Sequence, residues 1–351
     1  MNGRRVGILL VVAVAVIGAG IWLSSKRSVN RAPTTGQPVL EGLKPALNEV
    51  TEIQLSKGDG TKATLRKREK DWLVVEREYP ADSGKVRKLL LDLGALSVME
   101  EKTSDPANYA LLGVEDVNSA AATGTQVHLV TPAKPFGLIV GKPGGMKAVY
   151  VRPSDGRQSL LASPPLTVEA DAKRWLDHTV ADIPESRIKE VVITPESGPV
   201  YTVTRENTEQ TDFTVPNLPR GRALSSAGAA NAVAGDLAAF ALDDVRKAPE
   251  GAADPSPTKA QRAVFRTFDG LEVEVEGQKE GDQHWVTLTP RSSARETMEE
   301  AQRIDERVKG RQFEIPAYRY DALFRPLEEL LEEPAGKKPA GGSLPMSGPQ
   351  S

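Results

Sequence analysis

The stretch Val50–Val75 (VTEIQLSKGDGTKATLRKREKDWLVV) decides the fold expected for this chain. Apolar residues alternate with polar ones on both sides of Asp59-Gly60. An Asp-Gly pair between two alternating runs is the strongest short-range sign of a β-hairpin. A third strand is expected at Asp71–Val75. The stretch therefore predicts an antiparallel sheet that begins near residue 50.

A helix is predicted directly after these strands. Asp82 or Ser83 can cap its first turn, and the apolar residues that follow recur at helical spacing, at Val86, Leu89, Leu90, Leu93 and Leu96. Apolar runs at 127–130, 136–140 and 148–151 predict further strands, with turns at 141–145 and 155–156. Residues 45–184 are therefore expected to form one α+β unit.

The second half of the chain repeats this order. Ile188, Val191 and Ile193 have the same spacing as Val50, Ile53 and Leu55, and Asp269-Gly270 marks another hairpin. A last helix is expected at Tyr320–Glu333, with a kink or a later start at Pro326. The pattern predicts a second α+β unit at 185–333. The expected fold is two similar halves of antiparallel sheet with helices on one face, related by internal duplication.

An uncharged segment, Val6–Leu23, precedes these units. A helix needs about 20 apolar residues to cross a bilayer, with a lower limit near 17, so residues 1–27 are expected to form a transmembrane anchor that contacts membrane lipid through residues 6–23. A cleaved signal peptide is the alternative. A signal peptide has small residues at its cleavage site, and Trp22-Leu23 occupies that position here. Ser24-Ser25 nevertheless keeps cleavage possible.

Pro and Gly residues in 28–44 predict a linker, whose last residues could instead pack on the fold. Residues 334–351 are expected to be a disordered tail. Basic residues flank the uncharged segment on both sides, so the positive-inside rule leaves its orientation open. Because nearly all of the chain follows the segment, we expect residues 28–351 outside the cytoplasm. The expected location is the inner membrane of a bacterium, with the soluble part in the periplasm.

Charge and composition exclude several classes of function. The formal net charge is -3, and the first 31 residues hold five basic and no acidic residues, so the remainder carries -3 - 5 = -8. An acidic ectodomain argues against binding nucleic acid, which needs clustered Lys and Arg. The chain has no cysteine, which excludes disulfides, thiolate nucleophiles and cysteine-ligated metals.

No catalytic, metal-binding or cofactor-binding residue is predicted, and we expect no enzymatic activity. His128, His178 and His284 lack the close spacing of metal pairs, and Gly141–Gly145 (GKPGG) suits a hairpin turn better than a phosphate loop. Paired carboxylates interleaved with Arg, such as Glu299-Glu300, are typical of solvated helix faces. Tyr318-Arg319-Tyr320 with Phe313 indicates either a protein interface or a strand edge packed on the last helix.

Several of these stretches together resemble the bacterial DUF4340 family of unknown function. They are the Trp strand Asp71–Val74 with the helix after it, Tyr109–Val114 (YALLGV), Leu138–Gly141 (LIVG), Ala148–Val151 (AVYV) and Arg307–Asp321 (RVKGRQFEIPAYRYD). The resemblance covers most of residues 45–331. It implies single-pass envelope proteins with repeated copies of the domain, often encoded beside ABC-type export systems. It implies no catalytic residues, and this chain departs from it in long loops at 216–228 and 247–259.

The expected function is that of a membrane-anchored, extracytoplasmic accessory or scaffold subunit of an envelope ABC-type transport system, with a permease or ATPase as protein partner. The alternative is a polysaccharide- or peptide-binding module of the cell envelope that acts without a transporter. A hydrolase would need two titratable groups to meet in one cleft, which spacing alone does not indicate.

Overall fold

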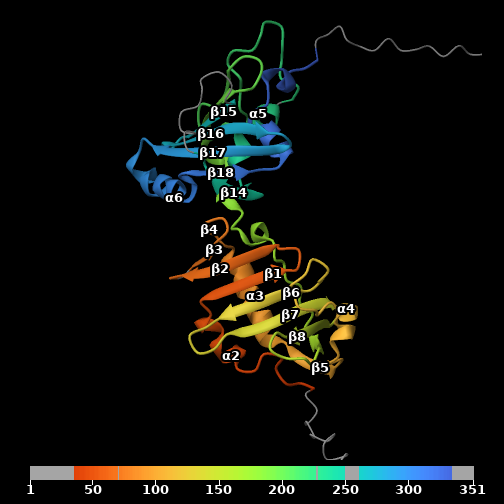
Figure 1. Ribbon diagram of the computed structural model, residues 1–351. Helices are drawn as coiled ribbons and strands as arrows, with labels where there is room; N and C mark the ends of the chain where they lie inside the picture. The colour runs from red at the N-terminus through yellow and green to blue at the C-terminus, as the bar shows by residue number, and fades with distance from the viewer. Residues whose placement is uncertain (1–34, 70, 227, 250–260, 334–351) are drawn as a thin grey trace, which may run out of the picture. The chain divides into compact units, whose positions relative to one another are not determined.

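The computed structural model describes residues 35–69, 71–226, 228–249 and 261–333 (Figure 1). The chain forms two compact units, with Met1–Trp72 and Gly84–Asp171 in unit 1, and Leu73–Ser83 and Ala172–Ser351 in unit 2. The expected span 6–23 and tail 334–351 lie outside the described residues. Among the helices that are described, none is long and apolar enough to cross a membrane.

The division between the units differs from the expected one after residue 184. Residues 73–83 and 172–183 both belong to unit 2, and backbone contacts join them. Ala81 forms an isolated β-bridge with Leu176, and the Asp82 N–H donates to the Trp175 carbonyl at 2.8 Å. This pairing links segments about ninety residues apart, so local sequence carries no sign of it.

The first sheet has nine strands in the order β4-β3-β2-β1-β6-β7-β8-β9-β5. Its strands are β1 (Glu52–Lys57), β2 (Lys62–Arg68), β3 (Asp71–Val74), β4 (Tyr79–Pro80), β5 (Ser97–Glu101), β6 (Thr125–Val130), β7 (Phe136–Pro143), β8 (Val149–Pro153) and β9 (Leu160–Ser163). The helices of this part of the chain are α2 (Leu43–Ala46), α3 (Ser83–Ala95) and α4 (Tyr109–Leu112).

The predicted hairpin at Asp59-Gly60 is confirmed. Strands β1 and β2 pair antiparallel, with Ile53 opposite Leu65, and Gly60 has φ 86°, a conformation that only glycine adopts without strain. One face of the sheet is buried at its centre, where Ile53 and Leu129 are 0% exposed. Helix α3 lies behind these strands in Figure 1 and buries its Val86, Leu89, Leu90 and Leu93. This is the helix that the apolar spacing predicted.

A second helix covers part of the opposite face, so helices in unit 1 are not confined to one side. Ile139 alternates with the buried Leu138 along β7 and therefore points the other way. It packs with Tyr109 from α4 and with Val114 in a small buried cluster. The expectation of helices on one face alone is thus wrong for this unit, because the loop that carries α4 folds back over the sheet.

The described part of the expected linker 28–44 packs on unit 1. Val39, Leu40 and Leu43 are buried, and the Gly36 N–H donates to the Val98 carbonyl at 2.7 Å. Pro38 forms a β-bridge with Ser97. The alternative held open for the end of this segment, that it packs on the fold, therefore holds for residues 36–44, although they form turns, one β-bridge and the start of α2 rather than an extended stretch.

The second sheet has seven strands in the order β12-β11-β15-β16-β17-β18-β14, beside a two-stranded pair β10-β13. Its elements are β10 (Thr179–Ala181), β11 (Ile188–Thr194), β12 (Tyr201–Thr204), β13 (Phe240–Ala241), β14 (Asp244–Lys247), β15 (Gln261–Thr267), β16 (Leu271–Glu280), β17 (Gln283–Ser292), β18 (Arg311–Glu314), α5 (Gly228–Ala234), α6 (Met298–Val308) and α7 (Ala317–Leu323). The expected last helix stops at Leu323, and a 3₁₀ helix, Leu327–Leu330, follows Pro326.

Seven strands have the same connectivity in both sheets. The order β2-β1-β6-β7-β8-β9-β5 in the first corresponds to β12-β11-β15-β16-β17-β18-β14 in the second. In each, the first two strands form a hairpin, a helix comes later in the chain (α3 or α5), and a strand after that helix, β5 or β14, lies at the far edge. This agreement makes β5 and β14 equivalent edge strands.

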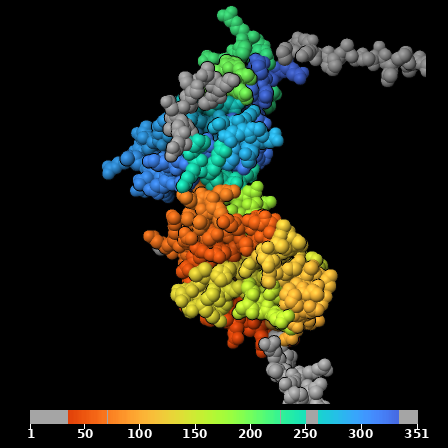
Figure 2. Space-filling model, viewed as in Figure 1, coloured from red at the N-terminus to blue at the C-terminus, as the bar shows by residue number. Residues whose placement is uncertain are grey.

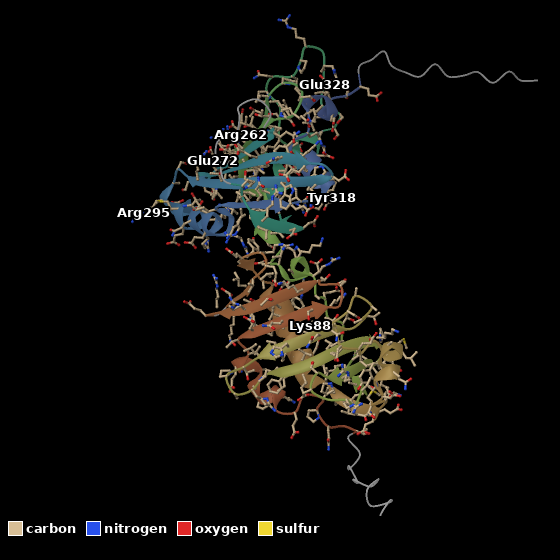
Figure 3. All side chains as sticks on the ribbon, viewed as in Figure 1. Lys88, Arg262, Glu272, Arg295, Tyr318 and Glu328 are labelled. Carbon is tan, nitrogen blue, oxygen red and sulfur yellow. The ribbon has the colours of Figure 1, made fainter. Side chains whose placement is uncertain are left out.

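The two faces of the second sheet differ in character. Val273, Val275 and Phe265 are buried on one face, and the neighbouring residues of the same strands point to the other face. That other face carries Arg–Glu pairs, such as Arg266 Nε to Glu272 Oε2 at 2.8 Å. Arg262 and Glu272 are labelled there in Figure 3. Side chains fill the spaces between the ribbons in the space-filling view (Figure 2).

Candidate binding site

A groove runs along the edge strand β14 in unit 2. It has a volume of about 350 Å³ and is lined by Glu76, Arg77, Glu78, the four residues of β14 and Trp285. We call this the β14 groove. Its lining holds three acidic side chains (Glu76, Glu78, Asp244) and three basic ones (Arg77, Arg246, Lys247). The groove therefore offers charged side chains and backbone groups for recognition.

The backbone of β14 is paired on one side. Asp244 lies opposite Glu314 and Arg246 opposite Gln312 in β18. The Val245 N–H instead donates to Oδ1 of the neighbouring Asp244 at 2.8 Å. In an antiparallel pair, alternate residues direct their N–H and C=O to the partner strand and away from it. Val245 therefore directs its amide toward the outer edge, where a local carboxylate accepts it.

Arg246 is held firmly within the groove. Its Cζ lies 3.8 Å from the ring centroid of Trp285, its Nη1 donates to Glu280 Oε2 at 2.8 Å, and its Nε donates to Gln312 Oε1 at 3.0 Å. The hydrogen bond from Arg246 lowers the pKa of Glu280 below its ordinary value. A guanidinium that is stacked and bound by two groups loses little further freedom when a ligand approaches.

Charged pairs tie the wall of the groove to the strand. Arg77 donates to Asp244 through Nε at 2.6 Å and through Nη2 at 2.9 Å, a geometry with two parallel bonds. Lys247 Nζ lies 2.9 Å from Glu78 Oε1, and both of these side chains are largely exposed. The Arg77 pair is therefore the stronger of the two, because exposed pairs contribute only about 0–1 kcal/mol.

The equivalent strand in unit 1 also borders a cavity. This cavity has a volume of about 530 Å³ and is lined by Gln37, Pro38, Val39, Val98, Glu101, Ser104, Pro153, Gly156, Arg157, Gln158 and Leu160. The difference lies at the edge of β5, where residues 36–39 already run alongside the strand. The two edge strands thus share a position and a neighbouring cavity, and among the described residues a further β-bridge is added at β5 but not at β14.

The three histidines do not come together. His178 Nδ1 lies 2.7 Å from the Leu242 carbonyl, His284 packs against the Tyr320 ring with centroids 4.9 Å apart, and His128 lies opposite Gln54 in the β1–β6 pair. All three are half-buried. Within the described ranges, no group of three or more His, Asp or Glu side chains could hold a metal ion.

Most of the aromatic cluster that we singled out is packed inside. Tyr320 and Phe313 are 1% and 0% exposed, whereas Tyr318 is 71% exposed, and Figure 3 shows its side chain pointing away from the fold. Alternate faces of the short helix α7 explain the difference. Only Tyr318 in this cluster is therefore available to a partner.

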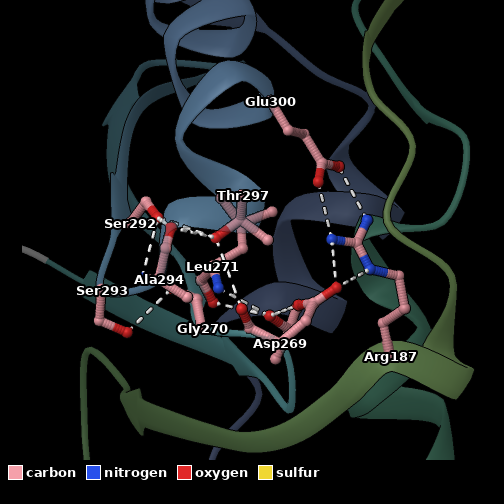
Figure 4. A network of polar contacts seen from close by, with 10 residues as sticks. Arg187, Asp269, Gly270, Leu271, Ser292, Ser293, Ala294, Thr297 and Glu300 are labelled. Carbon is pink, nitrogen blue, oxygen red and sulfur yellow. Dashed lines mark hydrogen bonds and ion pairs between the residues drawn. The ribbon is translucent and has the colours of Figure 1, made fainter.

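Glu300, one of the paired carboxylates, has a structural role. Arg187 donates to Glu300 through Nη1 at 2.8 Å and Nη2 at 2.7 Å, and to Asp269 through Nε at 3.0 Å. The hydrogen bonds with Glu300 contribute most to raising the pKa of Arg187, and the bond with Asp269 also raises it. Figure 4 shows the resulting network around the Asp269-Gly270 turn. It fastens helix α6 to the β15–β16 hairpin.

One buried carboxyl group belongs to no motif in the sequence. Asp236 follows α5, and its buried Oδ2 has no hydrogen-bond partner among the described residues. Burial raises the pKa of Asp236 to about 7, against the opposing effect of Arg325 and Arg319. No sequence signal could have found it, because the residues that enclose it come from distant segments.

A family model described as "Domain of unknown function (DUF4340)" matches residues 72–263. The match covers 192 of the 351 residues, which is more than half of the chain. No curated protein and no solved structure matches the chain significantly.

Proposed function

This chain belongs to the DUF4340 family, and we propose that it is a membrane-anchored accessory or scaffold subunit of an envelope ABC-type transport system. The soluble units would lie on the periplasmic side of the inner membrane of a bacterium. They would engage a permease or ATPase complex without catalysing a reaction. The link to ABC transport comes from the resemblance described above.

The observation that carries this proposal is the position at which the fold begins. Gly36 is already hydrogen-bonded to β5, so only residues 24–35 (35 - 23 = 12) separate the uncharged segment from unit 1. Even when fully extended, twelve residues span at most about 40 Å. A tether this short would hold unit 1 beside the membrane, where a membrane partner is in reach.

The architecture supports a role in protein contacts. Edge strands present backbone donors and acceptors to other chains, and each sheet ends in an edge strand beside a cavity. We also infer that the two halves arose by duplication, since seven strands share one connectivity. Two similar units in tandem would give a scaffold one cavity beside an edge strand in each unit.

Two experiments test this proposal. Purification of the full chain from bacterial membranes should recover a permease or ATPase, and recovery of the chain alone would count against it. An alkaline phosphatase reporter fused after Leu331 should be active, since the enzyme folds only outside the cytoplasm. An inactive reporter would overturn the periplasmic placement, and the family membership would be unaffected.

The second candidate function is an envelope polysaccharide- or peptide-binding module that acts without a transporter. The cavities beside β5 and β14 favour it. If a single class of oligosaccharide or peptide raises the Tm of the full chain and no transport component co-purifies, this alternative replaces the first.

A further inference from the structure

The equivalent edge strands β5 and β14 differ in what lies beside them. Beside β5, residues 36–39 make three backbone hydrogen bonds around the isolated bridge between Pro38 and Ser97. The Gly36 N–H donates to the Val98 carbonyl at 2.7 Å. The Val98 N–H donates to the Gln37 backbone carbonyl at 2.9 Å, and the Val39 N–H donates to the Leu96 carbonyl at 2.9 Å. The edge of β5 therefore already pairs with neighbouring backbone, through one isolated β-bridge between Pro38 and Ser97.

Strand β14 lacks this addition in the part of the chain that the structure describes. Residues 76–78 face it across the groove, but no backbone–backbone hydrogen bond joins them to it within the described ranges. The contacts that cross the groove are made by side chains, those of Arg77 with Asp244 and Lys247 with Glu78. The space of about 350 Å³ between them lies along the whole length of the strand.

We propose that the β14 groove binds an extended peptide segment of a partner protein as an eighth strand of the second sheet. The inference rests on the proposed function, because it names the surface through which such a subunit would hold its partner. The occupant is a peptide because β14 offers backbone groups that alternate at strand spacing, the pattern that strand addition uses. The equal numbers of acidic and basic lining residues fit a segment with little net charge.

Binding of the peptide would replace one hydrogen bond of the Val245 amide with another, so the amide would not lose its partner. The Val245 N–H now donates to Asp244 Oδ1, and a peptide carbonyl would replace that oxygen. Asp244 would keep its two bonds from Arg77. A side-chain acceptor on an outward amide protects an edge strand against unspecific pairing. A peptide backbone can displace it, because the peptide forms hydrogen bonds with several residues of the strand at once.

The test uses the full chain and a phage-displayed heptapeptide library as the probe. Because the chain has no cysteine, Glu78→Cys with Lys247→Cys can be bridged by a short bismaleimide, which closes the groove. A matched control bridges Lys88→Cys with Asp92→Cys, an exposed pair on α3. We expect enriched peptides to bind the groove-bridged chain at least tenfold more weakly than the control-bridged chain.

Hydrogen exchange of the full chain then locates the bound peptide. An enriched synthetic peptide should slow exchange of the Val245 and Lys247 amides at least tenfold and leave β5 unchanged. The site is overturned if no peptide is enriched, if both bridged chains bind equally, or if protection lies elsewhere. A membrane partner that co-purifies with the groove-bridged chain would sink the β14 site and leave the proposed function standing. Absence of any partner from the unmodified chain would instead count against the proposed function.

Discussion

The guanidinium of Arg246 lies over the indole of Trp285, with Cζ 3.8 Å from the ring centroid. Arg246 belongs to the edge strand β14 and Trp285 to β17, which lies two strands away in the sheet order. The stack covers an indole that is only 5% exposed. It therefore shapes the floor of the β14 groove and also contributes to the stability of unit 2.

Arg246→Ala should lower the free energy of unfolding by about 2 kcal/mol. The change removes a partly buried cation–π contact and leaves Glu280 and Gln312 without their donor. Urea unfolding followed by tryptophan fluorescence measures it. Lys247→Ala is the control, since its exposed ion pair predicts a loss of at most about 1 kcal/mol. Equal losses in the two variants would show that the stack contributes nothing.

Asp236 should make the stability of the protein fall as pH rises. Its pKa is about 7 in the fold against an ordinary value of 3.8, so the folded state binds the proton more tightly than the unfolded state does. The contribution is fully favourable below pH 4, decreases between about pH 4 and 7, and is lost above that. The difference corresponds to at most about 4 kcal/mol.

Asp236→Asn should remove this dependence, because asparagine stays neutral. Above pH 7 the variant should be more stable than the parent chain by a few kcal/mol, and the two should converge near pH 4. Thermal unfolding between pH 4 and 8 measures both curves. Parallel curves would mean that Asp236 does not titrate in this range.

Gly277→Ala should destabilise unit 2 by about 2–4 kcal/mol. A Cβ at this position would lie 2.4 Å from Phe324 Cε2 and 2.7 Å from the Tyr320 hydroxyl, so the aromatic rings would have to move away from the strand. Gly228→Ala is the control, because a Cβ there meets nothing within 4 Å. Chemical denaturation should separate the two variants clearly, and equal stability would contradict the packing of Tyr320 and Phe324 against β16.

Arg187→Ala should cost about 2 kcal/mol, because it leaves Glu300 and Asp269 as neighbouring carboxylates without their shared cation. Part of the loss should disappear in high salt, which screens the remaining repulsion. Lys88→Ala breaks an exposed pair on α3 and should cost no more than about 0.5 kcal/mol. A salt-independent loss for Arg187→Ala would indicate packing rather than charge.

Local signals predicted the elements whose causes are local. Asp59-Gly60 and Asp269-Gly270 form turns because their glycines take φ 86° and 90°, which other residues avoid. The helix after Asp82 follows from its apolar spacing. The last helix ended earlier than expected because the residue before a proline is disfavoured in the α region, and Pro326 follows Arg325 directly.

The residues of the candidate site could not be predicted in this way. Arg77 and Asp244 are 167 positions apart in the chain, and neither belongs to a motif. The aromatic cluster at Tyr318-Arg319-Tyr320 indicated a possible protein interface, yet of its two tyrosines only Tyr318 is exposed. The amino-acid composition shows which side chains are present, but it does not show which of them lie at the edge of a sheet in the folded protein.

By itself, the sequence determined the turns, the helix α3 and the alternating strands, and its match to the DUF4340 model placed the chain in that family. These depend on the conformational preferences of neighbouring residues, which act over a few positions. Only the tertiary structure decided which strands lie at the sheet edges. It also decided to which unit residues 36–44 and 73–83 belong, and that Arg246 stacks on Trp285. Pairing between strands is set by burial of whole faces across the sheet, and that is a property of the complete fold.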